Sequence, residues 1–346
     1  MIISFQKTLR DALKKMSKEG KKSLIIGDEG NIFKGILSDG DIRKALLKGK
    51  NLKTKIKDIY NKKASFLYED EYQEKIAKDI FQKKRFDIIP IIKRNNELVK
   101  ILYWYDFFQT KRVSQNLKDC PLIIMAGGKG TRLKPFTQIL PKPLIPVNNK
   151  TVLERIIEPF FNSGVKDYYL TVNYKAKILK AFFEELDPEY NVQFIEEKKP
   201  LGTAGSLKNI PKKIKTPFLI TNCDVIFQLD CHELVDFHKT NKFDLTLVAS
   251  TKEITIPYGV CKTNKEGVLE NIDEKPTFDY LVNTGLYVIN PSIIKYIPDD
   301  KYFDMPQLIE TAKNNGNTIG VFPIDETQWV DVGQWEEYEK AKSRLE

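Results

Sequence analysis

The chain has 346 residues, of which 41% are hydrophobic, so it can form two domains that each bury a core. No apolar run approaches the ~20 residues of a membrane-spanning helix, and the N-terminus lacks the features of a signal peptide, so we expect a cytoplasmic protein that does not bind membranes. The net charge of +9 is uneven: residues 1–115 carry 27 Lys and Arg against 15 Asp and Glu, and residues 116–346 carry 29 against 32. Because the basic residues are scattered and lack interleaved aromatic residues, we expect no binding of nucleic acid.

Cysteine and histidine are sparse and do not lie at the spacings of metal ligands. The chain contains four cysteines and two histidines: Cys120, Cys223, Cys231, Cys261, His232 and His238. No two cysteines form a CxxC pair, which disfavours a zinc site, and the number and spacing of cysteines indicate no disulfide framework. We therefore expect reduced thiols.

Residues 1–115 contain a weak internal repeat whose first copy reads helix, strand, strand, helix. An amphipathic pattern over residues 8–20 predicts a helix that stops at Gly20. Apolar runs at 23–28 and 32–38 predict two strands, and a second helix is expected from Asp39.

The second copy repeats this order. It has a predicted helix over 74–85, strands over 86–93 and 98–104, and a helix over 105–111. Since neither copy can bury its apolar face alone, we expect the two to pack against each other.

The run from Gly35 to Asp41 resembles the signature of a CBS domain, so the repeat resembles a tandem CBS pair. The resemblance implies that Ser38 and Asp41 bind the phosphate and ribose of an adenine or guanine nucleotide, since a hydroxyl can donate to phosphate and a carboxylate can accept from ribose. The second copy has Tyr103 in place of the serine and keeps only Asp106. The alternative is that the pair only dimerises the protein.

After a polar stretch at 110–120, residues 120–346 alternate between strand and helix. Predicted strands and helices follow each other from 121 to 250. Thr151 is a plausible N-cap of the helix that stops at Gly164. The alternation predicts an α/β fold with a Rossmann-like, mostly parallel sheet, whose ligands bind at the carboxyl ends of the strands.

A bare, cationic loop follows the first of these strands. Gly127, Gly128 and Gly130 let the backbone approach a polyphosphate, and Arg132 adds a guanidinium for phosphate oxygens. The loop does not end in the Gly-Lys-Ser/Thr of a Walker loop, and its glycines are not ordered as in a dinucleotide fingerprint.

The run from Gly127 to Val147 resembles the signature of the sugar-1-phosphate nucleotidyltransferases, and this resemblance continues to about residue 340. It implies that a sugar-1-phosphate oxygen attacks the α-phosphorus of a nucleoside triphosphate and that pyrophosphate leaves. By this resemblance Arg132 stabilises the leaving pyrophosphate, and Lys142 steers the α-phosphate and the sugar phosphate. The implied nucleotide-binding loop comprises Ala126, Gly127, Gly128, Gly130 and Thr131.

Two carboxylates match the metal ligands of that family. Asp224 follows an apolar strand, and Asp331 lies in the run Trp329–Trp335. With phosphate and water oxygens they fit the preference of Mg²⁺ for hard ligands. We therefore expect Mg²⁺ as the cofactor.

The segment from Glu196 to Leu207 resembles the nucleobase loop, with Pro200, Gly202 and Thr203 close to the base. Glu197 stands where uridylyl and thymidylyl relatives tend to carry glutamine. A carboxylate can accept from both N1–H and the N2 amino group of guanine, which favours GTP. Reading of the base by Glu196 or by a backbone group stays open.

Three later segments resemble the sugar side of the family's site. They imply that Gly259, Glu274, Lys275, Asn283 and Thr284 line one sugar-phosphate pocket. A further segment of the family pattern, around Asp304, is expected to be mainly structural, with Asp304 as a helix N-cap.

A CBS pair in front of such a domain resembles the guanylyltransferases of bacterial legionaminic acid pathways, which act on glucosamine-1-phosphate. Mannose-1-phosphate or heptose-1-phosphate guanylyl transfer and uridylyl or thymidylyl transfer are the enzymatic alternatives. A catalytically inactive nucleotide-sensing protein is the alternative of a different class. Because CBS pairs commonly dimerise, we expect a homodimer.

Overall fold

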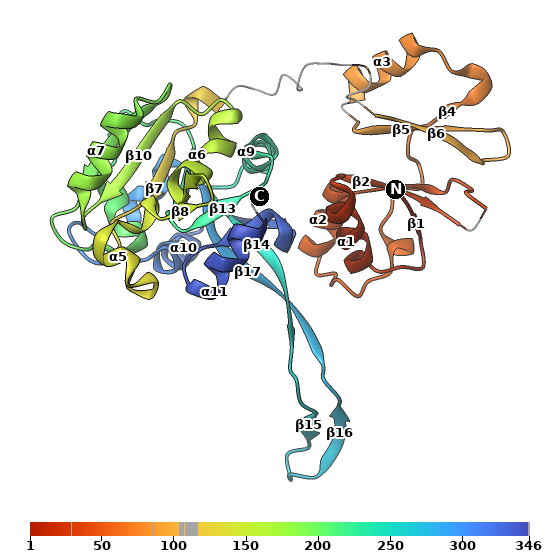
Figure 1. Cartoon of the computed structure of the whole chain (residues 1–346). Helices are drawn as coiled ribbons and strands as arrows, with labels where there is room; N and C mark the ends of the chain where they lie inside the picture. Colours follow the sequence, from red (N-terminus) through yellow and green to blue (C-terminus); the bar gives the residue numbers. More distant parts are fainter. Residues whose placement is uncertain (29, 85, 104–106, 108–116, 345–346) are drawn as a thin grey trace. The chain divides into compact units, whose positions relative to one another are not determined.

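The computed structural model describes residues 1–28, 30–84, 86–103, 107 and 117–344, and the chain divides into two compact units, Met1–Val113 and Ser114–Glu346 (Figure 1). Asp106 and all but one residue of the helix expected over 105–111 lie outside the described residues. In the part of the chain that is described, no helix combines the length and apolar character needed to cross a membrane.

Unit 1 contains two copies of one small α/β arrangement. The first copy comprises β1 (Ile2–Ser4), α1 (Leu9–Glu19), β2 (Ser23–Gly27), β3 (Gly35–Ser38) and α2 (Asp39–Leu47). The second comprises β4 (Leu67–Tyr68), α3 (Glu74–Lys84), β5 (Ile88–Ile92) and β6 (Leu98–Tyr103). Each forms a three-stranded sheet in which the first strand is parallel to the middle strand and the third is antiparallel to it. The repeat expected from the sequence is therefore present, with β1 and β4 as additional strands.

The two copies pack together as expected. Phe33 N–H donates to Asn96 O at 2.8 Å, and Leu98 N–H donates to Asn31 O at 2.9 Å, so the two hairpin turns are joined. A shared apolar cluster covers both sheets; it includes Ile25, Phe33, Ala64, Ile88 and Ile92. Burial of this cluster requires both copies.

The ends of α1 show why its sequence forms a helix. Thr8 accepts from Asp11 N–H, and the Asp11 carboxylate accepts from Thr8 N–H, which closes a capping box. Gly20 ends the helix at φ 60°, a left-handed conformation that glycine adopts without strain, as predicted.

Unit 2 is built on a seven-stranded sheet in the order β11-β10-β7-β12-β17-β14-β18. Its strands are β7 (Leu122–Met125), β10 (Asp167–Val172), β11 (Asn191–Glu196), β12 (Phe218–Asn222), β14 (Leu245–Thr255), β17 (Thr277–Ile289) and β18 (Ile319–Ile324). All adjacent pairs are parallel except the two that β17 makes with β12 and β14. The mostly parallel sheet expected from the sequence is confirmed.

Helices cover both faces of this sheet. The helices of unit 2 are α5 (Phe136–Ile139), α6 (Val152–Asn162), α7 (Ala176–Leu186), α8 (Gly202–Gly205), α9 (Cys231–Thr240), α10 (Met305–Asn314) and α11 (Trp335–Arg344). Along β7, Leu122 and Ile124 enter one core cluster, and Ile123 and Met125 enter the other. The central strand is therefore buried on both faces, as its unbroken apolar run requires.

A long two-stranded ribbon extends from the sheet. The outer parts of β14 and β17 stay paired out to Thr255 and Thr277, and beyond them β15 (Val260–Thr263) pairs with β16 (Leu269–Asp273). Figure 1 shows this ribbon projecting from unit 2. The alternation seen in the sequence did not predict it.

Cysteines play no part in linking these elements. All four are free; Cys120, Cys223 and Cys231 are buried, and Cys261 is exposed. Burial raises the pKa of each of the three buried thiols to about 12, so they stay protonated at neutral pH.

Candidate active site

The glycine loop and Asp224 lie at one edge of the sheet of unit 2. β7 and β12 are parallel neighbours, and their last residues, Met125 and Asn222, are paired. The loop that follows Met125 and the residues that follow Asn222 therefore emerge side by side. This carboxyl edge is where the fold places ligands.

Lys142 and Asp224 form a largely buried ion pair at this edge. Lys142 Nζ lies 2.5 Å from Asp224 Oδ2, and the two side chains are 8% and 19% exposed. Lys142 begins a helical turn, Lys142–Leu144, between Pro141 and Pro143, whose rings restrict the backbone that presents the lysine. The ion pair joins Lys142, which the sequence assigns to the phosphates, to Asp224, which it assigns to the metal.

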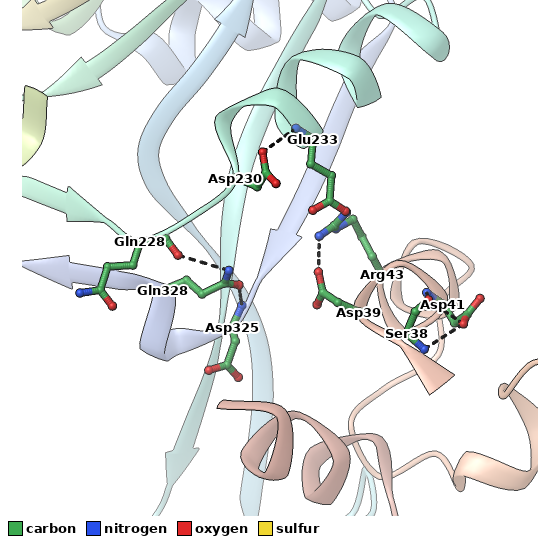
Figure 2. Close-up of polar contacts among 9 residues, drawn as sticks. All are labelled: Ser38, Asp39, Asp41, Arg43, Gln228, Asp230, Glu233, Asp325 and Gln328. Carbon is green, nitrogen blue, oxygen red and sulfur yellow. Dashed lines mark hydrogen bonds and ion pairs between the residues drawn. The ribbon is translucent and has the colours of Figure 1, made fainter. Parts of the chain in front are cut away.

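Asp331 reaches the same point from a separate small sheet. β13 (Val225–Phe227) and β19 (Trp329–Asp331) are antiparallel, with Val225 opposite Asp331. Val332 N–H donates to Asp224 O at 2.8 Å. At the far end of the pair, Gln228 N–H donates to Gln328 O at 2.9 Å, and Figure 2 shows these two glutamines together.

Gly333 shows how closely the three side chains gather. A Cβ atom added there would lie 2.8 Å from Asp331 Oδ1, 3.2 Å from Asp224 Oδ2 and 3.4 Å from Lys142 Nζ. Gly333 N–H also donates to Asp331 Oδ1 at 2.6 Å. A side chain at this position would displace the Asp331 carboxylate, a constraint that the sequence analysis did not identify although the glycine follows Asp331 by two residues.

Burial and the neighbouring charges shift the pKa of the Asp331 carboxyl group. Burial raises the pKa of its carboxyl group, and the like charge of Asp224 raises the pKa further. The Gly333 N–H hydrogen bond and the positive charges of Lys142 and Arg132 oppose these effects. Two carboxylate groups whose oxygens converge on one point fit a divalent cation.

The exposed part of the loop lies beside this cluster. Gly128, Thr131 and Arg132 are exposed, Gly127 and Gly130 are half-buried, and Ala126 is buried. Arg132 lies in a helical turn, Thr131–Leu133, and its side chain is available to solvent. The structure therefore brings Arg132, Lys142, Asp224 and Asp331 to one edge.

Gly130 permits the close approach of the loop to Lys142. Its φ is 63°, and a Cβ atom there would lie 2.8 Å from Thr137 Cγ2 and 3.0 Å from Lys142 Cβ. We expect Gly130→Ala to lower the free energy of unfolding by about 1–3 kcal/mol through the strained φ and the clash. Gly128 has no atom within 4 Å of the same position, so Gly128→Ala is the matched control. Equal melting temperatures of the two variants would contradict this role for Gly130.

Glu197 is buried against the glycine loop. A Cβ atom on Gly127 would lie 3.0 Å from Glu197 Oε1, and Leu201 N–H donates to Glu197 Oε2 at 3.3 Å. Burial raises the pKa of the Glu197 carboxyl group, and hydrogen bonds from Leu201, Thr171 and Ser206 oppose this rise. The carboxylate is thus fixed from three sides.

Glu196, the neighbouring acid, differs from Glu197 in its exposure, in its partner and in the direction of its pKa shift. Its side chain is 64% exposed, and it forms an ion pair with Lys180 on α7. The ion pair lowers the pKa of the Glu196 carboxyl group. Glu197, and not Glu196, therefore faces the loop.

The predicted nucleobase loop is held by α10. Asp304 Oδ1 accepts from Thr203 N–H at 2.9 Å and from Thr203 Oγ1 at 3.1 Å, and a Cβ atom on Gly202 would lie 2.8 Å from the same oxygen. Asp304 is also the N-cap of α10, as predicted. Since the Thr203 N–H already has this partner, Thr203 positions the loop, whereas Pro200 is exposed at its tip. The sequence analysis did not predict the Asp304 contact with the loop.

The predicted sugar-side residues form two separate groups. A Cβ atom on Gly259 would lie 3.0 Å from Glu274 Oε2, so these two, with Lys275, gather on the ribbon. Asn283 and Thr284 lie on β17 at the sheet, where Thr284 is buried and donates to Val248 O at 2.8 Å. The structure does not bring the two groups together.

Ser38 and Asp41 in unit 1 form a capping box at the start of α2. Ser38 N–H and Oγ both donate to Asp41 Oδ2, at 3.0 and 2.7 Å, as Figure 2 shows. Thr8 and Asp11 repeat this arrangement at α1. The pair therefore has a structural role in the helix, beside any role toward a ligand.

Comparison with known proteins identifies the chain. The model of the nucleotidyl transferase family matches residues 122–346. The chain belongs to this family. A CBS domain matches residues 2–48, the first copy in unit 1. The family and the CBS domain predicted from the sequence are thereby confirmed, and the narrower likeness to guanylyltransferases of legionaminic acid pathways stays a prediction.

Several curated relatives of this nucleotidyl transferase are mannose-1-phosphate guanyltransferases. The protein of Schizosaccharomyces pombe is 35% identical over 225 residues, which cover 62% of this chain and 61% of the relative. That of Saccharomyces cerevisiae is 34% identical over 226 residues, 61% of each chain. The chain thus spans 61% of the length of these relatives.

A solved structure has a similar fold. HddC from Yersinia pseudotuberculosis is 28% identical, with a TM-score of 0.52 over 66% of this chain and 100% of that chain. A second structure of HddC, complexed with GMP-PN, is 27% identical with a TM-score of 0.51. The α/β nucleotidyltransferase fold is confirmed.

Proposed function

We propose that the protein is a sugar-1-phosphate guanylyltransferase that forms GDP-sugar and pyrophosphate from GTP and a sugar-1-phosphate. The observation that carries the proposal is the convergence of Lys142, Asp224 and Asp331 at the carboxyl edge of the sheet, beside a glycine loop that packs on Glu197. The guanyltransferase names of the curated relatives and the GMP-PN complex of HddC support it.

The residues suit an in-line displacement at phosphorus. A sugar-phosphate oxygen forms a bond to the α-phosphorus, the bond from the α-phosphorus to the bridging oxygen breaks, and pyrophosphate leaves with the electron pair. Because the attacking phosphate is already an anion, the reaction needs no general base. Lys142 would hold the two reacting phosphates together, and Arg132 would stabilise the charge of pyrophosphate.

Asp224 and Asp331 would hold Mg²⁺. Their oxygens converge on Gly333, and hard carboxylate oxygens are the ligands that Mg²⁺ prefers. A bound Mg²⁺ neutralises charge on phosphate oxygens. Lys142, now paired with Asp224, would then be released to contact substrate phosphate.

Glu197 would read guanine through N1–H and the N2 amino group. We expect Glu197→Gln to lower kcat/KM for GTP about ten- to a hundredfold, because the amide cannot accept both hydrogen bonds, and to shift preference toward UTP or dTTP. Since burial opposes the charge of Glu197, the neutral glutamine should not lower the melting temperature.

Glu196→Gln is the matched control for this prediction. It removes the neighbouring carboxylate from an exposed ion pair with Lys180 and should leave nucleotide preference unchanged. Steady-state rates with each nucleoside triphosphate compare the two variants. Unchanged GTP preference in Glu197→Gln, or altered preference in Glu196→Gln, would overturn the assignment.

The names of the relatives favour mannose-1-phosphate as the sugar substrate. The resemblance to the guanylyltransferases of legionaminic acid pathways favours glucosamine-1-phosphate. Pyrophosphate release from GTP with each of these sugar phosphates tests the proposed function and its substrate together. Release with neither would remove the support for both sugars.

Residues 1–115 would act as a tandem CBS pair, and residues 120–346 as the catalytic domain. The shared topology of the two copies in unit 1 supports the tandem pair. An adenine or guanine nucleotide is the proposed ligand of Ser38 and Asp41, and a homodimer the proposed assembly. Titration of the full chain with each nucleotide tests the first of these.

A further inference from the structure

We propose that the ribbon of unit 2 completes the active site of a second copy of the chain, so that Gly259, Glu274 and Lys275 serve the sugar phosphate of the partner. The inference rests on the proposed function. It concerns which chain supplies the residues that bind the sugar phosphate in each active site. Neither the family match nor the names of the relatives address it.

The first observation is the length of the ribbon. β17 pairs with β14 residue by residue from Thr277 to Asn283, and Lys275 lies two residues before the strand begins. Since a strand rises about 3.3 Å per residue, Thr277 lies roughly 20 Å along the strand from Asn283 at the sheet, and Lys275 lies beyond Thr277. This distance is far longer than a hexose phosphate. Asn283 and Lys275 of one copy therefore cannot contact the same sugar while β17 stays straight.

The second observation is that the polar contacts of the ribbon are internal. Ile256 N–H donates to Pro276 O at 3.0 Å, and Lys262 forms an ion pair with Asp273 at 2.6 Å. Among the described residues, the hydrogen bonds and ion pairs found for 256–276 all join the ribbon to itself. The remainder of unit 2 does not anchor this segment.

The third observation is an exposed apolar strip on one face of the ribbon. Ile254 and Phe278 are paired across the strands, and Tyr280 lies two residues along on the same face. These side chains are 46%, 40% and 51% exposed, and the rings of Phe278 and Tyr280 are stacked with centroids 6.5 Å apart. A two-stranded ribbon uncovered on both faces is at best marginally stable in water, so this face requires a cover.

A second copy satisfies all three observations. The active site of the second copy lacks the sugar-binding residues that the ribbon carries. Because a dimer with two-fold symmetry treats both copies alike, each ribbon would enter the active site of the other copy. The strip of Ile254, Phe278 and Tyr280 would then be buried against the partner, and Glu274 and Lys275 would reach the partner's Lys142 cluster. Each site would thus be built from two chains.

Complementation between two inactive full-length variants tests the exchange. Asp224→Asn disables the body of unit 2, and Lys275→Asn disables the ribbon while tolerating the left-handed φ of 45° at that position. After co-expression in equal amounts, half of the dimers are mixed, and each mixed dimer has one intact site. The mixture should recover roughly one quarter of wild-type activity if the ribbon is exchanged. Activity no higher than that of the separate variants overturns the proposal.

Photo-crosslinking locates the ribbon by a measurement that does not depend on enzyme activity. With p-benzoylphenylalanine in place of Phe278, we expect a covalent dimer whose linked peptide comes from the carboxyl edge of the partner's sheet. The same replacement of Ile178, which is 38% exposed on α7, is the control and should give no dimer. A link within one chain, or to unit 1, contradicts the exchange. If the wild-type chain transfers no nucleotide, the proposed function fails, and the linked peptide still decides where the ribbon lies.

Discussion

Asp224→Asn is expected to lower kcat by about a thousandfold while leaving the fold intact, because a metal ligand and the partner of Lys142 are lost together. The change is isosteric, and it removes the repulsion between Asp224 and Asp331 together with the ion pair to Lys142, so the fold should be retained. Pyrophosphate release at saturating GTP and sugar-1-phosphate gives kcat, and thermal melting reports on the fold.

Asp187→Asn is the control for this variant. Asp187 ends α7 at φ 39°, a conformation that asparagine also tolerates, and it lies on the exposed surface. Its activity should equal that of the wild type. If Asp224→Asn retains more than about a tenth of wild-type kcat, Asp224 does not hold a metal that the reaction needs.

Lys142→Met is expected to lower kcat about a hundred- to a thousandfold, which is the cost of removing a cation that stabilises developing phosphate charge. Methionine keeps most of the volume of the buried side chain, but Asp224 and Asp331 lose the positive charge that offsets their repulsion. We therefore also expect a lower melting temperature. Added Mg²⁺ should restore part of that stability, because it replaces the missing charge.

Two further variants, Lys142→Arg and Lys134→Met, separate the effect of the charge at position 142 from the effects of side-chain shape and of the charge of the loop. Arginine restores the charge but not the shape of the ammonium, so Lys142→Arg should recover stability more than activity. Lys134 is exposed two residues after Arg132, and its replacement removes a positive charge of the same loop without changing the ion pair. An active Lys142→Met variant, or an equally damaged Lys134→Met variant, would contradict the role of Lys142.

The sequence predicted those features that depend on local patterns. The sequence predicted the strand that precedes the glycine loop, which is β7, and the capping residues Thr151 and Asp304 predicted the starts of α6 and α10. The sheet edge that carries the glycine loop followed from the alternation of strand and helix. Each of these features is encoded within a few neighbouring residues.

Long-range geometry was not predictable in this way. The contact of Asp304 with Thr203 joins residues about a hundred positions apart, and only the fold brings them together. The crowding of Asp224, Asp331 and Lys142 around Gly333 has the same origin.

The ribbon shows a third kind of limit. Residues 245–255 and 277–289 pair over a length that no single motif specifies, so the motifs around Gly259 and Glu274 were assigned to one pocket with Asn283. Similarity to a family assigned Gly259 and Glu274 to the sugar, which stays a prediction, and it did not predict that they lie on a ribbon apart from the sheet.

The most direct test of the account is pyrophosphate release in the presence of Mg²⁺, with GTP, UTP, dTTP, ATP and CTP each combined with mannose-1-phosphate, glucosamine-1-phosphate and glucose-1-phosphate. We predict release with GTP and with one of the first two sugars. Release with UTP or dTTP in preference to GTP would contradict the reading of guanine by Glu197. The absence of release from every combination would contradict the proposed guanylyl transfer itself.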